Sequence, residues 1–348
     1  MKYVRNHLHL SLLLTALLTL PLVGCDSFGE NDLTADVTRL FPVQIDGRWG
    51  YINAEGRITI EPVFREAGPF VEDRARARLN GKRGYINASG EFIREPDFDR
   101  TYDFSNGLAS VKVEGRWGFV DRSGRFVIDP QFKKACPFAE GRAFVFTDEN
   151  DWTYIDLLGK VMRTENTPEL REIEESAFSD GLALIKNREG SFGFINRDGE
   201  PVIAPQFPAA KAFSDGYAAV KISDRWGFID KNKEFVINPK YIAAGHFSEG
   251  LAPVRENTNT WGYTNRKGEM VIAPQFEEAR AFSNGRAAVM LNGRWGYIDT
   301  SGAWIVDAEY AEVEDFHLGL GRIRLDVGEA SRFGYVDRAG RYVWFPSD

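Results

Sequence analysis

The chain has 348 residues, of which 43% are apolar and 13% aromatic, so it can bury a sizeable core and does not have the composition of a disordered segment. Its formal net charge is -8 at pH 7, and removing residues 1–24, which carry two cations and no acid, makes the remainder about -10. An acidic body repels phosphate backbones, which argues against nucleic acid as a partner. Cys25 and Cys136 are the only cysteines, too few for a disulfide framework.

Residues 1–24 have the organisation of an export signal. A basic start with Lys2 and Arg5 precedes a leucine-rich run over 8–23, which at about 16 residues is short for a membrane-spanning helix. Leu22-Val23-Gly24-Cys25 resembles the bacterial lipobox, in which the cysteine thiol receives a diacylglyceryl group and the chain is cut just before it. The alternative is an ordinary signal peptide in which a cysteine happens to fall.

The lipobox resemblance implies an anchored protein. Acyl chains on Cys25, palmitate among them, would hold the mature chain on a bacterial membrane, because each buried CH₂ contributes about 0.8 kcal/mol. Residues 25–39 are predicted to be the lipidated N-terminus and a polar tether for 40–348. The expected location is the exported side of the cell membrane or of the outer membrane. Asp26 resembles the retention signal of enterobacterial lipoproteins and favours the inner membrane.

The body of the chain is organised by one repeated segment. A Trp-Gly-Tyr or Trp-Gly-Phe sequence, or a variant of it, occurs nine times at spacings of 34, 34, 35, 40, 34, 35, 34 and 38 residues. A fixed period of this size is typical of repeat architectures. Six of the eight tryptophans occupy its first position, which falls at Trp49, Arg83, Trp117, Trp152, Phe192, Trp226, Trp261, Trp295 and Phe333.

Each repeat is predicted to form a three-stranded antiparallel unit. Ala287, Val289 and Leu291 alternate with other residues as in a strand, and Asn292-Gly293 separates this run from the next, which indicates a type I′ hairpin. A third run with the pattern Val-Ile-x-Pro-x-aromatic follows. Its proline has no N–H to donate, so it belongs at a strand end or a sheet edge.

A second turn, with the pattern Asx-x-x-Gly, separates the second and third strands. The Asx side chain is expected to accept backbone N–H groups while the glycine takes a left-handed conformation. In the sixth repeat Lys233 replaces the glycine, and Asn232 is expected to take that conformation instead.

The repeated dipeptide is predicted to join neighbouring units. A glycine in eight of nine repeats implies close approach by something bulky, expected to be an aromatic ring of the next unit, and the tryptophans are expected to be buried between units. The repeat positions identified in this way include Trp49, Gly50, Trp117, Gly118, Trp226, Gly227, Trp261, Gly262, Trp295 and Gly296.

With both segments recurring in phase, residues 40–345 resemble the bacterial WG-repeat proteins. The resemblance implies a repeat scaffold with no known catalytic centre. Repeats in which Arg83, Phe192 or Phe333 replaces the tryptophan, or Thr153 the glycine, are expected to be locally weaker.

An open, twisted β-solenoid is the all-β architecture that the repeat length favours. Propeller blades usually have four strands and about 40 to 45 residues, which nine units of 34 fit poorly. The solenoid would end in the hairpin before Trp49 and in 342–345, and the insertion at 161–176 would project from one edge. The alternative is a closed, propeller-like ring, in which a strand near 41–45 completes a blade with the last segment.

No catalytic constellation emerges from the sequence. His246 and His317, the only histidines after residue 24, lack the spacing of metal ligands, and Cys136 is interpreted as a small packed hydrophobe. The serines of the recurring Phe-Ser-x-Gly pattern are interpreted as turn residues. No phosphate-binding or nucleotide-binding motif is present. The protein is therefore expected not to be an enzyme, and no catalytic, metal or cofactor-binding residue is predicted.

These features favour a membrane-anchored, non-enzymatic repeat scaffold that binds another protein in the bacterial cell envelope. The expected partners are membrane lipid, through acylated Cys25, and an envelope protein. The alternative is a surface of exposed aromatic side chains that binds a glycan or peptidoglycan. An envelope hydrolase, a third hypothesis, would need acids clustered outside the repeat pattern, for example within 165–175.

Overall fold

The computed structural model describes residues 39–162, 177–257, 259–327 and 330–345. They belong to one compact unit, Thr38–Asp348, and they contain β-strands but no helix, and hence no helix that could cross a membrane. The predicted export signal, Cys25, Asp26 and the tether up to residue 38 lie outside the described residues. The same is true of 163–176, which is most of the predicted insertion.

The strands form nine small antiparallel sheets, here called blades 1 to 9 in chain order. Blades 1 to 3 contain β1 (Phe41–Ile45), β2 (Arg48–Ile52) and β3 (Ile58–Phe64); β4 (Glu66–Val71), β5 (Arg74–Leu79) and β6 (Lys82–Ile86); and β7 (Arg100–Thr101), β8 (Leu108–Val113), β9 (Arg116–Asp121) and β10 (Phe126–Phe132). Blades 4 to 6 contain β11 (Lys134–Ala135), β12 (Ala143–Phe146), β13 (Trp152–Ile155) and β14 (Val161–Met162); β15 (Phe178–Ser179), β16 (Leu182–Lys186), β17 (Phe192–Asn196) and β18 (Pro201–Phe207); and β19 (Ala209–Ala210), β20 (Ala218–Ile222), β21 (Arg225–Ile229) and β22 (Phe235–Tyr241). Blades 7 to 9 contain β23 (Ala243–Ala244), β24 (Leu251–Arg255), β25 (Trp261–Asn265) and β26 (Met270–Phe276); β27 (Glu278–Ala279), β28 (Ala287–Leu291), β29 (Arg294–Ile298) and β30 (Trp304–Tyr310); and β31 (Glu312–Val313), β32 (Leu320–Val327), β33 (Ala330–Asp337) and β34 (Tyr342–Trp344).

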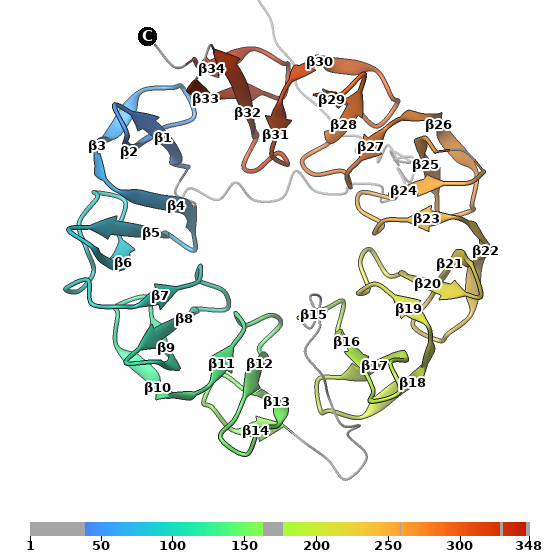
Figure 1. Ribbon diagram of the computed structural model, residues 1–348, viewed down its shortest axis with the longest axis horizontal. Coiled ribbons are helices and arrows are strands. Elements are labelled where there is room, and N and C mark those ends of the chain that lie inside the picture. The colour runs from blue at the N-terminus through green and yellow to red at the C-terminus, as the bar shows by residue number, and fades with distance from the viewer. Residues whose placement is uncertain (1–38, 163–176, 258, 328–329, 346–348) are drawn as a thin grey trace, which may run out of the picture. The chain divides into compact units, whose positions relative to one another are not determined.

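The nine blades are arranged in a ring, and the first strand of each four-stranded blade lies nearest its centre (Figure 1). The unit is thus a nine-bladed β-propeller, so the closed ring given as the alternative is confirmed and the preferred open solenoid is wrong. The error came from the strand count. Seven blades have four strands, because a strand of only two residues, such as β7, precedes the predicted hairpin and fits within a 34-residue repeat.

Blades 1 and 9 close the ring by packing against each other. Phe41, Val43 and Ile52 of blade 1 share a buried cluster with Leu320 and Tyr335 of blade 9. β1 pairs with β2 inside blade 1, whereas β31 to β34 form blade 9 by themselves. The prediction that a strand near 41–45 completes the last blade is therefore wrong, because closure uses side chains and not a shared sheet. The two chain ends of the repeat array are neighbours and not separate caps.

Both predicted turns are confirmed. In the first turn Asn292 and Gly293 have φ angles of 52° and 71°, as a type I′ hairpin requires. In the second turn the Asp299 carboxylate accepts the N–H groups of Ser301 and Ala303 at 2.9 and 3.0 Å. These bonds hold the chain in the reversal that leads to the outer strand.

In the second turn of the sixth repeat, the residue with the left-handed conformation is not the one that was predicted. Lys233 itself, and not Asn232, takes the left-handed conformation, with a φ angle of 68°. Its N–H donates to the Asp230 carbonyl oxygen at 3.0 Å, as the glycine N–H does in the other repeats. The turn geometry therefore outweighs the residue preference at this position.

The repeated glycine faces the outer strand of its own blade. A Cβ on Gly118 would lie 2.6 Å from the Ile128 carbonyl oxygen and 2.7 Å from the Pro130 nitrogen, where a register shift bends β10 across β9. The prediction that a ring of the next unit approaches this glycine is therefore wrong, because the close neighbour is backbone. Thr153 replaces the glycine in blade 4, whose outer strand β14 has only two residues and lacks the proline.

The tryptophans are less buried than predicted. Trp117 is 7% exposed, but the other five tryptophans at this position are only half-buried. The centre of each interface is instead formed by the aromatic residue two positions further along, as where the Phe119 ring lies 4.8 Å from the Phe138 ring of the next blade. The fully buried rings at this position are Tyr51, Tyr85, Phe119, Phe194, Phe228, Tyr263 and Tyr297.

Candidate functional site

Where the ring at the centre of an interface is a tyrosine, its hydroxyl also links the two blades. The Tyr85 hydroxyl of blade 2 donates to the Tyr102 carbonyl oxygen of blade 3 at 2.6 Å. Burial raises the pKa of Tyr85, so the hydroxyl keeps its proton and remains a donor. Equivalent bonds to the next blade join Tyr51 to Gly68, Tyr263 to Arg280 and Tyr297 to Glu314.

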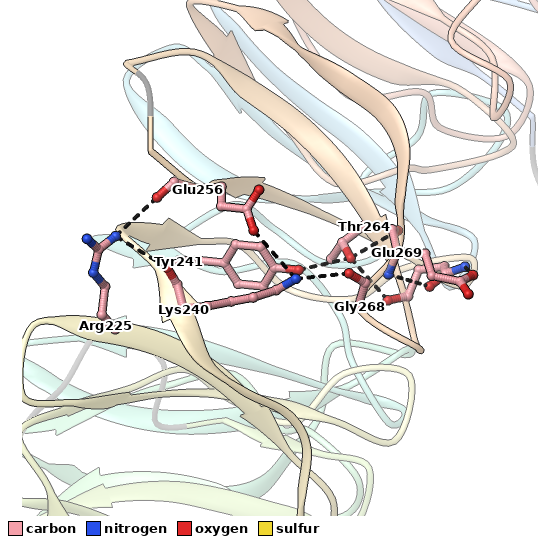
Figure 2. Close-up of polar contacts among 8 residues, drawn as sticks. Arg225, Lys240, Tyr241, Glu256, Thr264, Gly268 and Glu269 are labelled. Carbon is pink, nitrogen blue, oxygen red and sulfur yellow. Dashed lines mark hydrogen bonds and ion pairs between the residues drawn. The ribbon is translucent and has the colours of Figure 1, made fainter.

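Figure 2 shows the interface of blades 6 and 7, where two departures from the repeat meet. Tyr241 stands where most outer strands have phenylalanine, and Thr264 stands where the other repeats have isoleucine or valine. The buried Tyr241 hydroxyl donates to the Thr264 hydroxyl at 3.1 Å. At the rim, Arg225 donates to the carbonyl oxygens of Lys240 and Glu256 at 3.3 and 3.1 Å. Polar groups thus join these blades both inside and outside the apolar contact.

The inner turns, which lie between the first and second strands of the blades, form a chain of hydrogen bonds from blade 2 to blade 9. Asn106 and Gly107 show the geometry, with φ angles of 56° and 82°. The N–H of Gly107 donates to the Glu72 carboxylate of the preceding blade at 2.8 Å, and that of Gly141 donates to Asn106 at 2.7 Å. The chain continues from Gly181 to Glu140, Gly216 to Asp180, Gly250 to Asp215, Gly285 to Glu249 and Gly319 to Asn284.

Arginines of the Asx turns reinforce this chain at every second interface. Arg122 of blade 3 pairs with Glu72 of blade 2 at 3.0 Å, and its carbonyl oxygen accepts a bond from Arg74 at 3.0 Å. The contact shows that the inner turns and the Asx turns lie on one side of the ring, here called the turn face. The matching pairs are Glu140 with Arg197, Asp215 with Arg266 and Asn284 with Arg338. This two-blade period was not apparent in the 34-residue repeat.

The Asx turn of blade 4 departs from the polar character of the turn face. Leu157 and Leu158 occupy its two central positions and are 37% and 83% exposed, and Val161 beside them is 50% exposed. In the other eight Asx turns this pair of positions includes at least one polar residue. Sequence reasoning missed this apolar turn, defined as Leu157, Leu158 and Val161, because the Asx-x-x-Gly pattern constrains only the ends of the turn. The two adjacent leucines in a turn that is otherwise polar could have indicated this apolar site from the sequence.

The residues considered for chemistry lie apart. His246 and His317 belong to blades 7 and 9, and among the residues that the structure describes no group of three or more His, Cys, Asp or Glu side chains is placed to hold a metal ion. Ser214 donates to the Phe247 carbonyl oxygen of the next blade at 2.7 Å, so it is a turn residue, as predicted, and also an interface residue. Cys136 packs, half-buried, against the core between blades 4 and 5.

Several solved structures are similar to this one at low sequence identity. A crystal structure of the eukaryotic initiation factor has a TM-score of 0.61 and 10% identity, over 88% of this chain and 95% of that one. BamB from Moraxella catarrhalis has a TM-score of 0.46 and 11% identity, over 82% of this chain and 96% of its own. The computationally designed Ika8 protein has a TM-score of 0.48 and 12% identity, over 73% and 91%. The first likeness concerns the fold alone, and no curated protein sequence matches the chain.

One family model matches the sequence, and its description is WG containing repeat. The matches fall at residues 49–82, 84–117, 117–150, 192–226, 226–258, 261–295 and 295–326. Each begins at or beside the repeated dipeptide of one blade and runs into the hairpin of the next, so the matches follow the blades. Since they cover more than half of the chain, the protein belongs to the family of WG containing repeat proteins.

Proposed function

We propose that the protein is a non-enzymatic repeat scaffold, anchored to a bacterial membrane through acylated Cys25, that binds another protein in the cell envelope. The observation that carries the protein-binding part is the apolar turn. Adjacent exposed apolar side chains within a polar surface are typical of protein contact sites, where a buried apolar centre is surrounded by a polar rim.

The rigidity of the turn face supports this role. The chain of hydrogen bonds between inner turns and the buried ring at each interface leave the face little conformational freedom. Binding to a rigid surface loses less entropy than binding to a mobile one, so a modest apolar anchor such as Leu158 suffices to hold a partner. The Asn106 side chain, which accepts a bond from the Gly141 N–H, belongs to the same turn face and supplies polar groups there.

The tryptophan platform considered for glycan binding is less well supported. Cations lie over several of the half-buried indole rings, with the Arg280 guanidinium 4.6 Å from the Trp295 ring and the Arg255 guanidinium 5.2 Å from the Trp261 ring. A half-buried ring with a guanidinium over one face offers a sugar less free surface than an exposed ring does. Protein binding therefore remains the preferred function.

Capture from detergent-solubilised bacterial membranes tests the protein-binding part. The full-length chain is expected to retain one defined partner in stoichiometric amount, and the Leu157→Ser, Leu158→Ser double variant is expected to lose it. Val202→Ser is the matched control, because Val202 is 44% exposed on the outer strand of blade 5 and is not part of the apolar turn. Capture that survives the double variant, or the absence of any stoichiometric partner, would reject the proposal.

Membrane fractionation tests the anchor separately. The full-length chain is expected to float with membrane vesicles, and Cys25→Ser is expected to stay in the soluble fraction, because one acyl-accepting thiol is removed. If both forms float equally, lipidation of Cys25 is not what holds the protein.

A further inference from the structure

Blade 2 has neither a tryptophan at the repeat position nor the stacked aromatic pair that blade 3 has there. Arg83 forms an isolated β-bridge with Phe98 in the register in which Trp117 pairs with Phe132, so Arg83 stands at the tryptophan position. In blade 3, Tyr102 precedes Trp117 by 15 residues and stacks on the indole with ring centroids 5.3 Å apart. The residue that precedes Arg83 by the same interval is Gly68. Both the ring and its cover are therefore missing from blade 2.

A pocket of about 560 Å³ occupies this place, between blades 2 and 3. Its volume falls within the range of small-molecule sites, about 300 to 1,000 Å³. The residues that shape it include Glu66, Gly68, Arg76 and Arg83 of blade 2 with Arg100 and Tyr102 of blade 3. Trp117 also contributes to the wall, behind the Tyr102 ring that stacks on it.

The charges in the pocket wall are predominantly positive. Three arginines line it and only one glutamate does. Glu66 accepts bonds from Arg83 at 3.2 Å and from Arg78, just outside the wall, at 2.6 Å. The Arg100 backbone pairs with Lys112, but its side chain makes no hydrogen bond or ion pair with the described residues. The protein as a whole has a net charge of -8, so a pocket wall with more arginines than acids differs from the rest of the molecule. Such a local positive charge attracts anionic ligands.

Arg83 is paired with Glu66, and Arg76 is also paired but retains binding capacity. Arg76 donates to both carboxylate oxygens of Asp103 in blade 3, at 2.5 and 3.2 Å, through Nε and Nη2. Its Nη1 is not used in that pair. The ion pair fixes the direction of the guanidinium, whose Nε and Nη2 lie beside Gly68, and it therefore also fixes the position of Nη1. Arg76 is therefore a pre-oriented cation in the pocket wall, and the exposed Arg100 side chain adds a second cation that no ion pair with a described residue orients.

We propose that this pocket binds a sugar ring that bears a carboxylate, such as a uronic acid residue of a glycan. The planar donor fork of arginine matches a carboxylate in geometry and charge. The Tyr102 side chain is 43% exposed and lies flat on Trp117, and its ring face attracts the slightly positive C–H face of a sugar. The sugar hydroxyls meet the Glu66 carboxylate and the Thr101 hydroxyl, which also line the pocket. This ligand is distinct from the protein partner, because the apolar turn belongs to blade 4.

Titration calorimetry of the full-length chain with glucuronate, glucose and inorganic phosphate tests the proposal. Glucuronate is expected to bind at least tenfold more tightly than glucose, because only glucuronate has the carboxylate, and more tightly than phosphate, because phosphate has no ring. Equal binding of glucose would overturn the role of the arginines. Equal binding of phosphate would overturn the role of the aromatic wall.

Two variants test whether glucuronate binds in this pocket. Arg83→Trp restores the repeat residue and fills the pocket, and is expected to weaken glucuronate binding more than tenfold with an unchanged or raised melting temperature, which shows that the variant folds. Arg100→Gln is expected to weaken it severalfold. Arg57→Gln, which removes an exposed arginine paired with Glu55 in blade 1, is the control and is expected to change nothing. Unchanged binding to Arg83→Trp would overturn the assignment of this pocket.

Discussion

The Tyr335 hydroxyl donates a hydrogen bond to the Pro42 carbonyl oxygen at 2.9 Å, joining residues 293 positions apart. The same bond occurs inside the array, where the Tyr297 hydroxyl donates to the Arg322 carbonyl oxygen at 3.1 Å. Pro42 pairs with Tyr51 as Arg322 pairs with Tyr335, so the two acceptors occupy equivalent positions. The ring is therefore closed by one more copy of the interface that joins its neighbouring blades.

Tyr335→Phe is expected to lower the free energy of unfolding by about 1–2 kcal/mol, because the Pro42 carbonyl loses a partner at a part-buried position while the ring contact remains. Tyr85→Phe removes the tyrosine hydroxyl bond between blades 2 and 3, whose acceptor is the Tyr102 carbonyl oxygen at a different position of the repeat, and is expected to have a similar cost. Urea unfolding of the two variants makes the comparison. A far larger effect of Tyr335→Phe would show that closure is not equivalent to the other interfaces.

Trp117→Ala is expected to cost about 3–5 kcal/mol, because its indole is 7% exposed and the substitution leaves a cavity. Trp295→Ala is expected to cost less, because that ring is half-buried, although the substitution also removes its contact with the Arg280 guanidinium. Unfolding curves of both variants in guanidinium chloride give the two differences in free energy. Equal losses would contradict the burial that distinguishes the two rings.

Gly118→Ala is expected to cost about 3 kcal/mol, because its Cβ would lie 2.6 Å from the Ile128 carbonyl oxygen and the backbone would have to move. Gly115→Ala is the control. Gly115 has a φ angle of 83°, but no atom lies within 4 Å of the position that its Cβ would take, so only left-handed strain of about 1 kcal/mol is expected. In thermal melts, Gly118→Ala should lower the melting temperature more than Gly115→Ala does. The reverse order would mean that the outer strand can move away from the added methyl group at little cost.

Asp299→Asn is expected to reduce the dependence of stability on acid pH. The Ser301 hydroxyl and the backbone N–H groups of Ala303 and Ser301 lower the pKa of Asp299, although desolvation opposes them. A carboxyl whose pKa is lower in the folded state stabilises the protein above its ordinary pKa, about 3.9, and this contribution is lost as pH falls through the folded value. Asparagine accepts the same N–H bonds, as Asn265 does in the seventh repeat.

Melting temperatures of the parent and of Asp299→Asn between pH 7 and pH 2 provide the measurement. The parent is expected to be the more stable form at pH 7, and the difference is expected to vanish at the acid end. A difference that stays constant over this range would mean that the charge of Asp299 contributes nothing.

The hairpins, the Asx turns and the edge prolines were predictable from the sequence, because each depends on the conformations of a few adjacent residues. Asn292-Gly293 reverses the chain wherever such a pair separates two alternating runs, and the Asp299 side chain reaches only two to four residues along the chain. The family could be recognised for the same reason, because the repeated dipeptide and the outer-strand proline recur in phase.

The two-residue first strands were not predictable. A strand such as β7 is too short to show alternation, and its pairing with β8 depends on the chain returning from the preceding blade. Without that strand the repeat appeared too small for a propeller blade. The neighbour of Gly118 was missed for a related reason, since the bend that brings Pro130 over it arises from a register shift and not from any local pattern.

The sequence by itself determined the nine repeats, their turns and the family, and it predicts the lipid anchor at Cys25. Only the tertiary structure decided that the array closes, that the buried rings are those after the glycines, and that Leu158 and the Arg83 pocket lie open. Closure depends on a small rotation between consecutive blades that adds up over nine of them, so that Tyr335 meets Pro42. The apolar turn and the pocket at Arg83 are open because neighbouring blades do not cover them. This can be seen only once the positions of the neighbouring blades are known.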